Sequence, residues 1–179
     1  MSSFTKGLKK VEVALKWDPS PIGTPPHDLD IIAATYTSDD PGDDPGDAPA
    51  YVVHFDSRSP DGTITLNRDS TTGQGFGFDE VMTLELERLS PSYARVVVGI
   101  AIQQGERATV FGAVANTAVR IREGYTDLAQ NDFSEVADST AAVIAEFTRD
   151  DSGEWAFREI LRGFDSDPTS FAAAMGRAR

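Results

Sequence analysis

The sequence predicts an all-β fold, a two-sheet β-sandwich of short, mostly antiparallel strands with a short C-terminal helix. Apolar residues alternate with polar ones in many segments, as in Lys10 to Trp17, and this period of two is typical of half-buried strands. Proline, glycine and aspartate clusters separate these segments at short intervals, as in sandwich proteins. Near the C-terminus, Asp167 is followed by Pro168, which indicates a capped helix.

In the first half of the chain, the segment 80–89 could form either a helix or a strand. Its apolar residues recur with a period of two, which favours the strand. The tetrapeptide 59–62, Ser-Pro-Asp-Gly, has proline and glycine at the positions that a β-turn prefers. The predicted strands here are 10–17, 28–37 (beginning near Leu29), 50–55, 63–66 and 80–89.

In the second half, the nearly continuous β-branched segment 94–102 predicts a strand that is buried on both faces. A helix across 139–149 is the alternative to a strand there, and 111–116 is predicted as a short irregular turn. In the C-terminal helix, Phe171, Ala174 and Met175 share one face. The predicted strands are 94–102, 117–122, 127–133, 140–148 and 154–161.

The composition is that of one folded domain, and we expect residues 1–179 to form it. Hydrophobic residues make up 40% and charged residues 25%, which excludes wholesale disorder. Inside the domain, 38–50 contains DDPGDDPGD, and its prolines, glycines and mutually repelling aspartates predict a flexible acidic loop.

The net charge of −13 is concentrated between residues 27 and 80. This segment contains twelve acids and two bases, so its own net charge is 2 − 12 = −10. Nucleic acid is therefore not expected as a partner, because phosphate binding needs a basic surface. A divalent cation or a basic protein suits this charge, and an acidic surface that only keeps the protein dispersed is the simpler alternative.

The N-terminal segment MSSFTKGLKKVEVAL has lysines but no apolar run after them, so we expect no signal peptide. No segment has an apolar run long enough to cross a bilayer, so no membrane insertion is expected. The chain has no cysteine, which fits a reducing compartment such as the cytoplasm and excludes disulfides and thiolate metal sites.

The stretch 67–80, NRDSTTGQGFGFDE, is a glycine-rich loop with Asp69 near its front and Asp79 and Glu80 at its end. Its alternating glycines permit positive φ, which can turn several backbone carbonyls toward one centre. Carboxylates and carbonyls suit a hard cation such as Ca²⁺, and Asp28 and Asp30 of the earlier strand are the natural additional ligands. The twelve positions from Asp69 to Glu80 match the length of an EF-hand loop, but Gln74 occupies the position of its glycine and the flanks are predicted strands.

Other chemistries have little support in the residues. With two histidines, His27 and His54, and no cysteine, a structural zinc site is not expected. No GxSxG or GxxxxGK[ST] motif occurs, which argues against a serine hydrolase of that pattern and a P-loop nucleotide site. A glycosidase needs two carboxylates at a defined separation, which sequence alone does not show.

The ordered series W-D, D-L-D, S-P-D-G-T-I-T, D-x-x-T-G-x-G-x-G-x-D-E, F-G-x-V and G-E-W-x-F-R resembles the TerD-type tellurium-resistance family, from Trp17 to Arg158. The resemblance implies a β-sandwich with calcium sites in acidic loops, a cytoplasmic bacterial protein, and a role in resistance to tellurite and other stresses. No enzymatic activity is attached to it, so we expect a non-enzymatic protein.

Position by position, the acids at the start of the second predicted strand and in the glycine loop match acids of the family. Asp56 falls where the family commonly has asparagine. Gln74, Phe76, Phe78 and Gln103 stand where the family usually has acids, which implies a divergent member with a weakened site, since calcium affinity follows ligand charge. The candidate metal ligands are Asp28, Asp30, Asp56, Asp69, Asp79 and Glu80.

Three functional hypotheses follow. The first is a calcium-binding stress-resistance protein, with protein partners in a stress-response complex. The second is a metal-free interaction module in which Phe76 and Phe78 make an apolar contact, since exposed aromatics suit protein recognition; both rings capping the core is its simpler alternative. The third is a carbohydrate-active or hydrolytic enzyme, which would need a cleft with two facing carboxylates.

Overall fold

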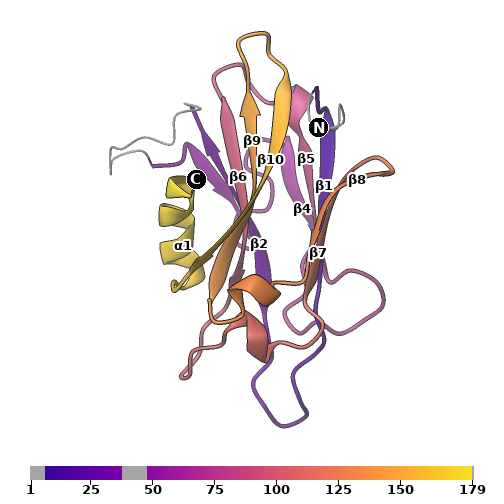
Figure 1. The fold of residues 1–179 in the computed structure, drawn as a ribbon, viewed down its shortest axis with the longest axis vertical. Coiled ribbons are helices and arrows are strands. Elements are labelled where there is room, and N and C mark those ends of the chain that lie inside the picture. The colour runs from indigo at the N-terminus through magenta and orange to yellow at the C-terminus, as the bar shows by residue number, and fades with distance from the viewer. Residues whose placement is uncertain (1–6, 38–47, 179) are drawn as a thin grey trace.

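The computed structural model, which describes residues 7–37 and 48–178, is a sandwich of two five-stranded antiparallel sheets with one short helix on its outside (Figure 1). One sheet, sheet A, has the order β10-β9-β6-β2-β3, and the other, sheet B, has the order β4-β5-β1-β7-β8. The all-β prediction is thus confirmed. Of the predicted acidic loop at 38–50, residues 38–47 lie outside the described residues.

The strands of sheet A are β2 (Leu29–Tyr36), β3 (Tyr51–Val53), β6 (Arg95–Ile102), β9 (Ala141–Arg149) and β10 (Trp155–Phe164). Those of sheet B are β1 (Lys10–Lys16), β4 (Ile64–Arg68), β5 (Glu80–Glu85), β7 (Ala118–Glu123) and β8 (Thr126–Asn131). Short 3-10 turns lie at Leu86–Arg88, Phe111–Ala113, Ser134–Val136 and Met175–Arg177, and α1 spans Pro168–Ala174.

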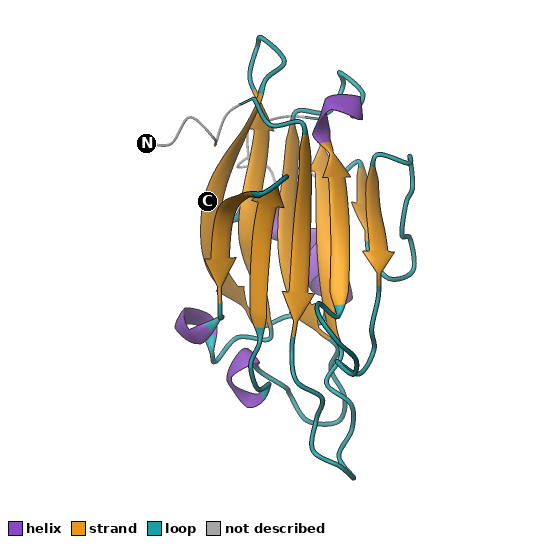
Figure 2. Cartoon of the chain, turned by 90° about the vertical axis from the view of Figure 1, so that its right-hand side faces the viewer, coloured by secondary structure: helices purple, strands orange, loops and turns teal. Residues whose placement is uncertain are grey.

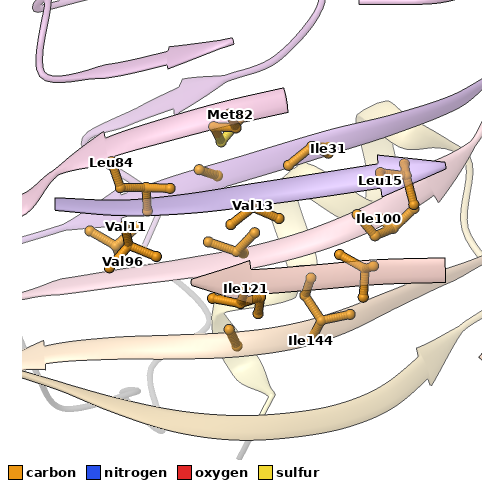
Figure 3. Close-up of a cluster of buried hydrophobic side chains, with 14 of the residues drawn as sticks. Val11, Val13, Leu15, Ile31, Met82, Leu84, Val96, Ile100, Ile121 and Ile144 are labelled. Atoms are coloured by element: carbon orange, nitrogen blue, oxygen red, sulfur yellow. The ribbon is translucent and has the colours of Figure 1, made fainter. Parts of the chain in front are cut away.

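The core lies between the sheets because each sheet turns one side of its pleat inward (Figure 3). Val13 and Leu15 of β1 and Met82 of β5 meet Ile31 of β2 and Ile100 of β6, and all five are fully buried. Alternation along the strand produces this arrangement, since every second side chain of β1 and β5 reaches the opposite sheet.

The central strands of sheet A, which are β2, β6 and most of β9, are buried on both faces, because α1 packs on the side away from sheet B. Phe171 and Met175 of the C-terminal segment lie in a second cluster with Ile32 of β2 and Val97 of β6. The side chain of Phe171 fills the space over Gly99, where a Cβ atom would collide with its ring. This explains why every residue of β2 and β6 is buried, as predicted for 94–102.

Three predicted elements differ from those observed in a way that bears on the site. The strand predicted for 80–89 ends at Glu85 and continues as a 3-10 turn, and 111–113 is a 3-10 turn within the predicted irregular segment. The strand expected over 50–55 is only Tyr51–Val53. His54 therefore lies beyond the strand rather than in its middle, in an isolated bridge with Ser57.

The candidate site residues gather at one end of the sandwich, the lower end in Figure 1. There β1, β4 and β6 finish while β2, β5 and β7 begin, so the loops that join them are neighbours. The long loops at this end are also visible below the strands in Figure 2.

Candidate metal centre

The candidate metal centre lies at an edge of sheet A that no strand covers. The short strand β3 pairs only with Ala33, Ala34 and Thr35 of β2, so the first half of β2 has no strand beside it on that edge. The backbone N–H of Ile31, which has no strand partner on that edge, donates instead to Glu80 Oε2 at 2.8 Å. This hydrogen bond holds the side chain of Glu80, the first residue of β5 in sheet B, against the edge of sheet A.

Three carboxylates converge there. Asp28 precedes β2, Asp30 is its second residue, and Glu80 begins β5; one oxygen from each lies within 4.8 Å of the others. Ligands on opposite sides of a Ca²⁺ ion lie about 5 Å apart, since each Ca–O distance is about 2.3–2.6 Å. The separation of the three carboxylates therefore fits one shared cation.

Burial makes this cluster costly without a counter-charge. Asp30 and Glu80 are 1% and 0% exposed, and Asp28 is half-buried. Desolvation, with repulsion from Asp30 and Asp69, raises the pKa of Asp28 to about 7. Desolvation raises the pKa of Asp30 to about 6, against hydrogen bonds that lower it. For Glu80, desolvation comes first and the contact with Asp69 second, and together they raise its pKa well above the usual range.

Asp69 completes the cluster from the front of the glycine loop. Its carboxyl faces Glu80 and adds to the repulsion on Asp28 and Asp30. Asp28 Oδ1, Asp69 Oδ1 and Glu80 Oε1 are buried and accept no hydrogen bond from any described residue. Oxygens of facing carboxylates cannot hydrogen-bond one another, because both are acceptors, unless a proton lies between them. A bound cation would satisfy these three oxygens together.

Two predicted ligands take other positions. Asp56 is exposed and lies outside the trio, although its charge raises the pKa of Asp30. Asp79 belongs to a different site: its Oδ2 accepts from the backbone N–H of Trp17 at 2.8 Å, and burial raises its pKa. Successive strand residues point to opposite faces, so Asp79 and Glu80 cannot serve the same ion from one strand.

Gln103 has a role that the sequence did not reveal. Its Nε2 donates to Asp30 Oδ2 at 2.8 Å, and its backbone N–H donates to the Asp28 carbonyl at 2.8 Å. The side chain thus orients one carboxylate of the trio. The signal for this role is the pairing of β2 with β6, which places Gln103 beside Asp28, and sequence spacing alone does not give that register.

The two loop phenylalanines differ. The Phe76 side chain is 97% exposed. The Phe78 ring is half-buried, and the Arg120 guanidinium carbon lies 4.5 Å from its centroid. Of the two, Phe76 is free for a partner, while Phe78 packs within the protein.

The comparisons with known proteins agree with the fold. The TerD domain model matches residues 1–174. The chain is a member of the TerD family. Tellurium resistance protein TerD from Serratia marcescens is 27% identical over 98% of this chain and 92% of its own length. General stress protein 16U from Bacillus subtilis is 29% identical, with the same coverage.

Solved TerD-family structures extend the likeness. A crystal structure described as a homologue of telluride resistance protein (TerD) from Streptomyces coelicolor is 60% identical, with a TM-score of 0.91, and the match covers 97% of this chain and 100% of that one. A crystal structure of a protein of unknown function is 61% identical with the same TM-score, over 97% of this chain and 99% of that one. Across the part of this TerD chain that the structure describes, no helix is long and apolar enough to span a membrane.

Proposed function

We propose that this TerD-family protein binds Ca²⁺ and acts, without catalysing a reaction, in cytoplasmic resistance to tellurium compounds and other stresses. The observation that carries the proposal is the buried acidic trio Asp28, Asp30 and Glu80, extended by Asp69, with three buried oxygens that no described residue satisfies. The names of the curated relatives, tellurium resistance protein and general stress protein, support the physiological role.

Calcium is favoured by the chemistry of the donors. All are oxygens, and the chain contains no cysteine, so softer metals lack their preferred ligands. When bound, the ion supplies positive charge that offsets the mutual repulsion of the carboxylates. The loop contributes only Asp69 and Glu80 as charged ligands, so we expect an affinity below that of a site with a full set of loop acids.

Calorimetric titration with Ca²⁺ tests the proposal. We expect heat of binding for the natural sequence and a higher melting temperature, since a ligand at a hundred times its Kd adds about 2.7 kcal/mol of stability. Asp28→Asn should lose most of the binding, because it removes one charge of the trio. The matched control is Asp151→Asn, in the exposed β9–β10 turn at the other end of the sandwich. Absence of both heat and thermal stabilisation at millimolar calcium would reject calcium binding.

The second candidate is a protein-interaction module, and the exposure of Phe76 favours it. Because the Phe78 ring already contacts Arg120, we assign the contact with a partner to Phe76 alone. In a pull-down from stressed cells, Phe76→Ser should lose a partner that the natural sequence retains. Retention of every partner by Phe76→Ser would count against this module, whatever the calcium result.

A further inference from the structure

Two basic residues lie next to each other on the outer face of sheet B, away from the metal centre. Lys16 of β1 pairs with Ala118 of β7, and Arg120 lies two residues further along β7. Residues two apart on a strand share a face, so Lys16, Ala118 and Arg120 project from the same surface. Glu80, by contrast, points inward from β5.

Among the described residues, neither cation forms an ion pair, although the chain has 29 acids and only 16 bases. Within residues 7–37 and 48–178, neither Lys16 nor Arg120 makes a side-chain hydrogen bond or an ion pair. Arg122, the next residue on this face of β7, is paired with Asp127 at 2.7 Å. Among the described residues, ion pairing on this face of β7 therefore reaches Arg122 but not Arg120.

The Arg120 side chain is held in place by an aromatic ring. Its guanidinium carbon lies 4.5 Å from the centroid of Phe78, and its Nε is buried without an acceptor. This cation–π contact restrains the guanidinium, and a planar guanidinium matches the two oxygens of a carboxylate or phosphate. An oxyanion that docks here meets a donor that is already oriented and partly desolvated.

A groove of about 570 Å³ surrounds the pair. Ala118 provides a small side chain between Lys16 and Arg120, and Gln130 and Ser134 add an amide and a hydroxyl to the lining. Asp132 and Glu135 also line this groove. Because these two acids repel additional negative charge, the groove suits one oxyanion group better than a polyanion.

We propose that this groove is a binding site for a ligand with a single oxyanion group, a carboxylate or a phosphate, held by Lys16 and Arg120. The proposal is independent of calcium binding, since none of the acidic trio lines the groove. It applies to a small molecule or to one acidic side chain of a polypeptide, because both present the same group.

The test is an NMR titration of the full chain in calcium-free buffer with sodium phosphate and, separately, with sodium acetate. Sodium chloride at matched ionic strength is the reference for screening effects. We expect saturable shifts of the backbone amides at 118–120 and 130–134 with at least one of the two oxyanions. Response to phosphate, to acetate or to both identifies the preferred group, and each result supports the site.

Two variants and a control locate the binding. Arg120→Gln should raise the Kd about ten-fold, because it removes a charged bidentate donor, and Lys16→Gln should raise it by a smaller factor. Lys10→Gln changes the net charge equally on the same exposed face of β1 and should leave the Kd unchanged. Unaltered melting temperatures show that the variants fold. Shifts no larger than those with chloride, or an unchanged Kd in Arg120→Gln and Lys16→Gln, would overturn the proposal.

Discussion

Asp79 and Glu80 are adjacent in the sequence, yet their carboxyl groups do different work. Asp79 Oδ2 accepts from the Trp17 backbone N–H and so ties the glycine loop to the end of β1. Glu80 Oε2 accepts from the Ile31 N–H and brings its second oxygen to the acidic trio. The two acids therefore offer a matched pair of substitutions with opposite expectations.

We predict that Glu80→Gln greatly weakens calcium binding but raises the melting temperature of the calcium-free protein. Glutamine keeps an oxygen for the Ile31 N–H and removes one charge from a buried, mutually repelling cluster. Asp79→Ala should leave calcium affinity nearly unchanged and lower stability by about 1–3 kcal/mol, because the buried Trp17 N–H loses its acceptor. Calorimetric titration and thermal melts of both variants measure this, and equal loss of calcium binding in the two would contradict the assignment.

At the scale of elements, the C-terminal segment is fastened to sheet A by one buried arginine. Arg95 of β6 is 1% exposed and donates to the carbonyls of Gly176 at 2.7 Å and Ala178 at 3.3 Å. Its Nε also donates to Glu146 Oε2 of β9 at 2.8 Å, and Arg158 reaches the other oxygen of Glu146 from the surface. The position of α1 thus depends on a polar contact inside an otherwise apolar layer.

We predict that Arg95→Met lowers the free energy of unfolding by about 3 kcal/mol, because it leaves two carbonyls and part of a buried carboxylate without donors. Arg158→Met removes the other, exposed partner of the same Glu146 and should cost less than about 1 kcal/mol. Chemical denaturation measures the difference, and hydrogen exchange should show faster exchange at 168–178 only in the first variant. Similar losses in the two variants would show that Arg95 does not fasten this segment.

For the whole molecule, stability should depend on pH through the acidic trio. The pKa of Asp28 is raised to about 7 and that of Asp30 to about 6, from an ordinary value of 3.8, and the pKa of Glu80 is also raised. Between about pH 4 and pH 7 the calcium-free folded protein therefore holds more protons than the unfolded chain. The stabilising contribution of these groups is full below about pH 4 and is lost as the pH rises through 7.

We predict that the melting temperature of the calcium-free protein falls from pH 5 to pH 8, and that added calcium raises it more at pH 8 than at pH 5. Calcium binds the ionised carboxylates, so it competes with protons at low pH. Thermal melts in chelator and in calcium across this range test the prediction. The net charge of −13 also favours low pH, so the double variant Asp28→Asn with Asp30→Asn is the control, and an equally steep slope in that variant would remove the trio as the cause.

The sandwich follows from features that are local in the chain. The period of two in Lys10 to Trp17 and the continuous apolar run of β6 predict half-buried and fully buried strands, and both are confirmed. Propensity alone leaves 139–149 open between helix and strand. Pairing of Ala141–Arg149 with β6 and β10 decides it for the strand, because a nine-residue strand between two partners satisfies its backbone on both edges.

The sequence by itself determined the fold class, the acidic character of the segment 27–80 and the presence of candidate ligands at the start of β2 and in the glycine loop. Only the tertiary structure decided which carboxylates share a point. Asp28, Asp30 and Glu80 converge because β3 is too short to cover the edge of β2, whereas Asp79 turns away because side chains alternate along β5. Residues 28 and 80 are distant in the chain, so their contact depends on strand register and pairing, and no local pattern carries that information.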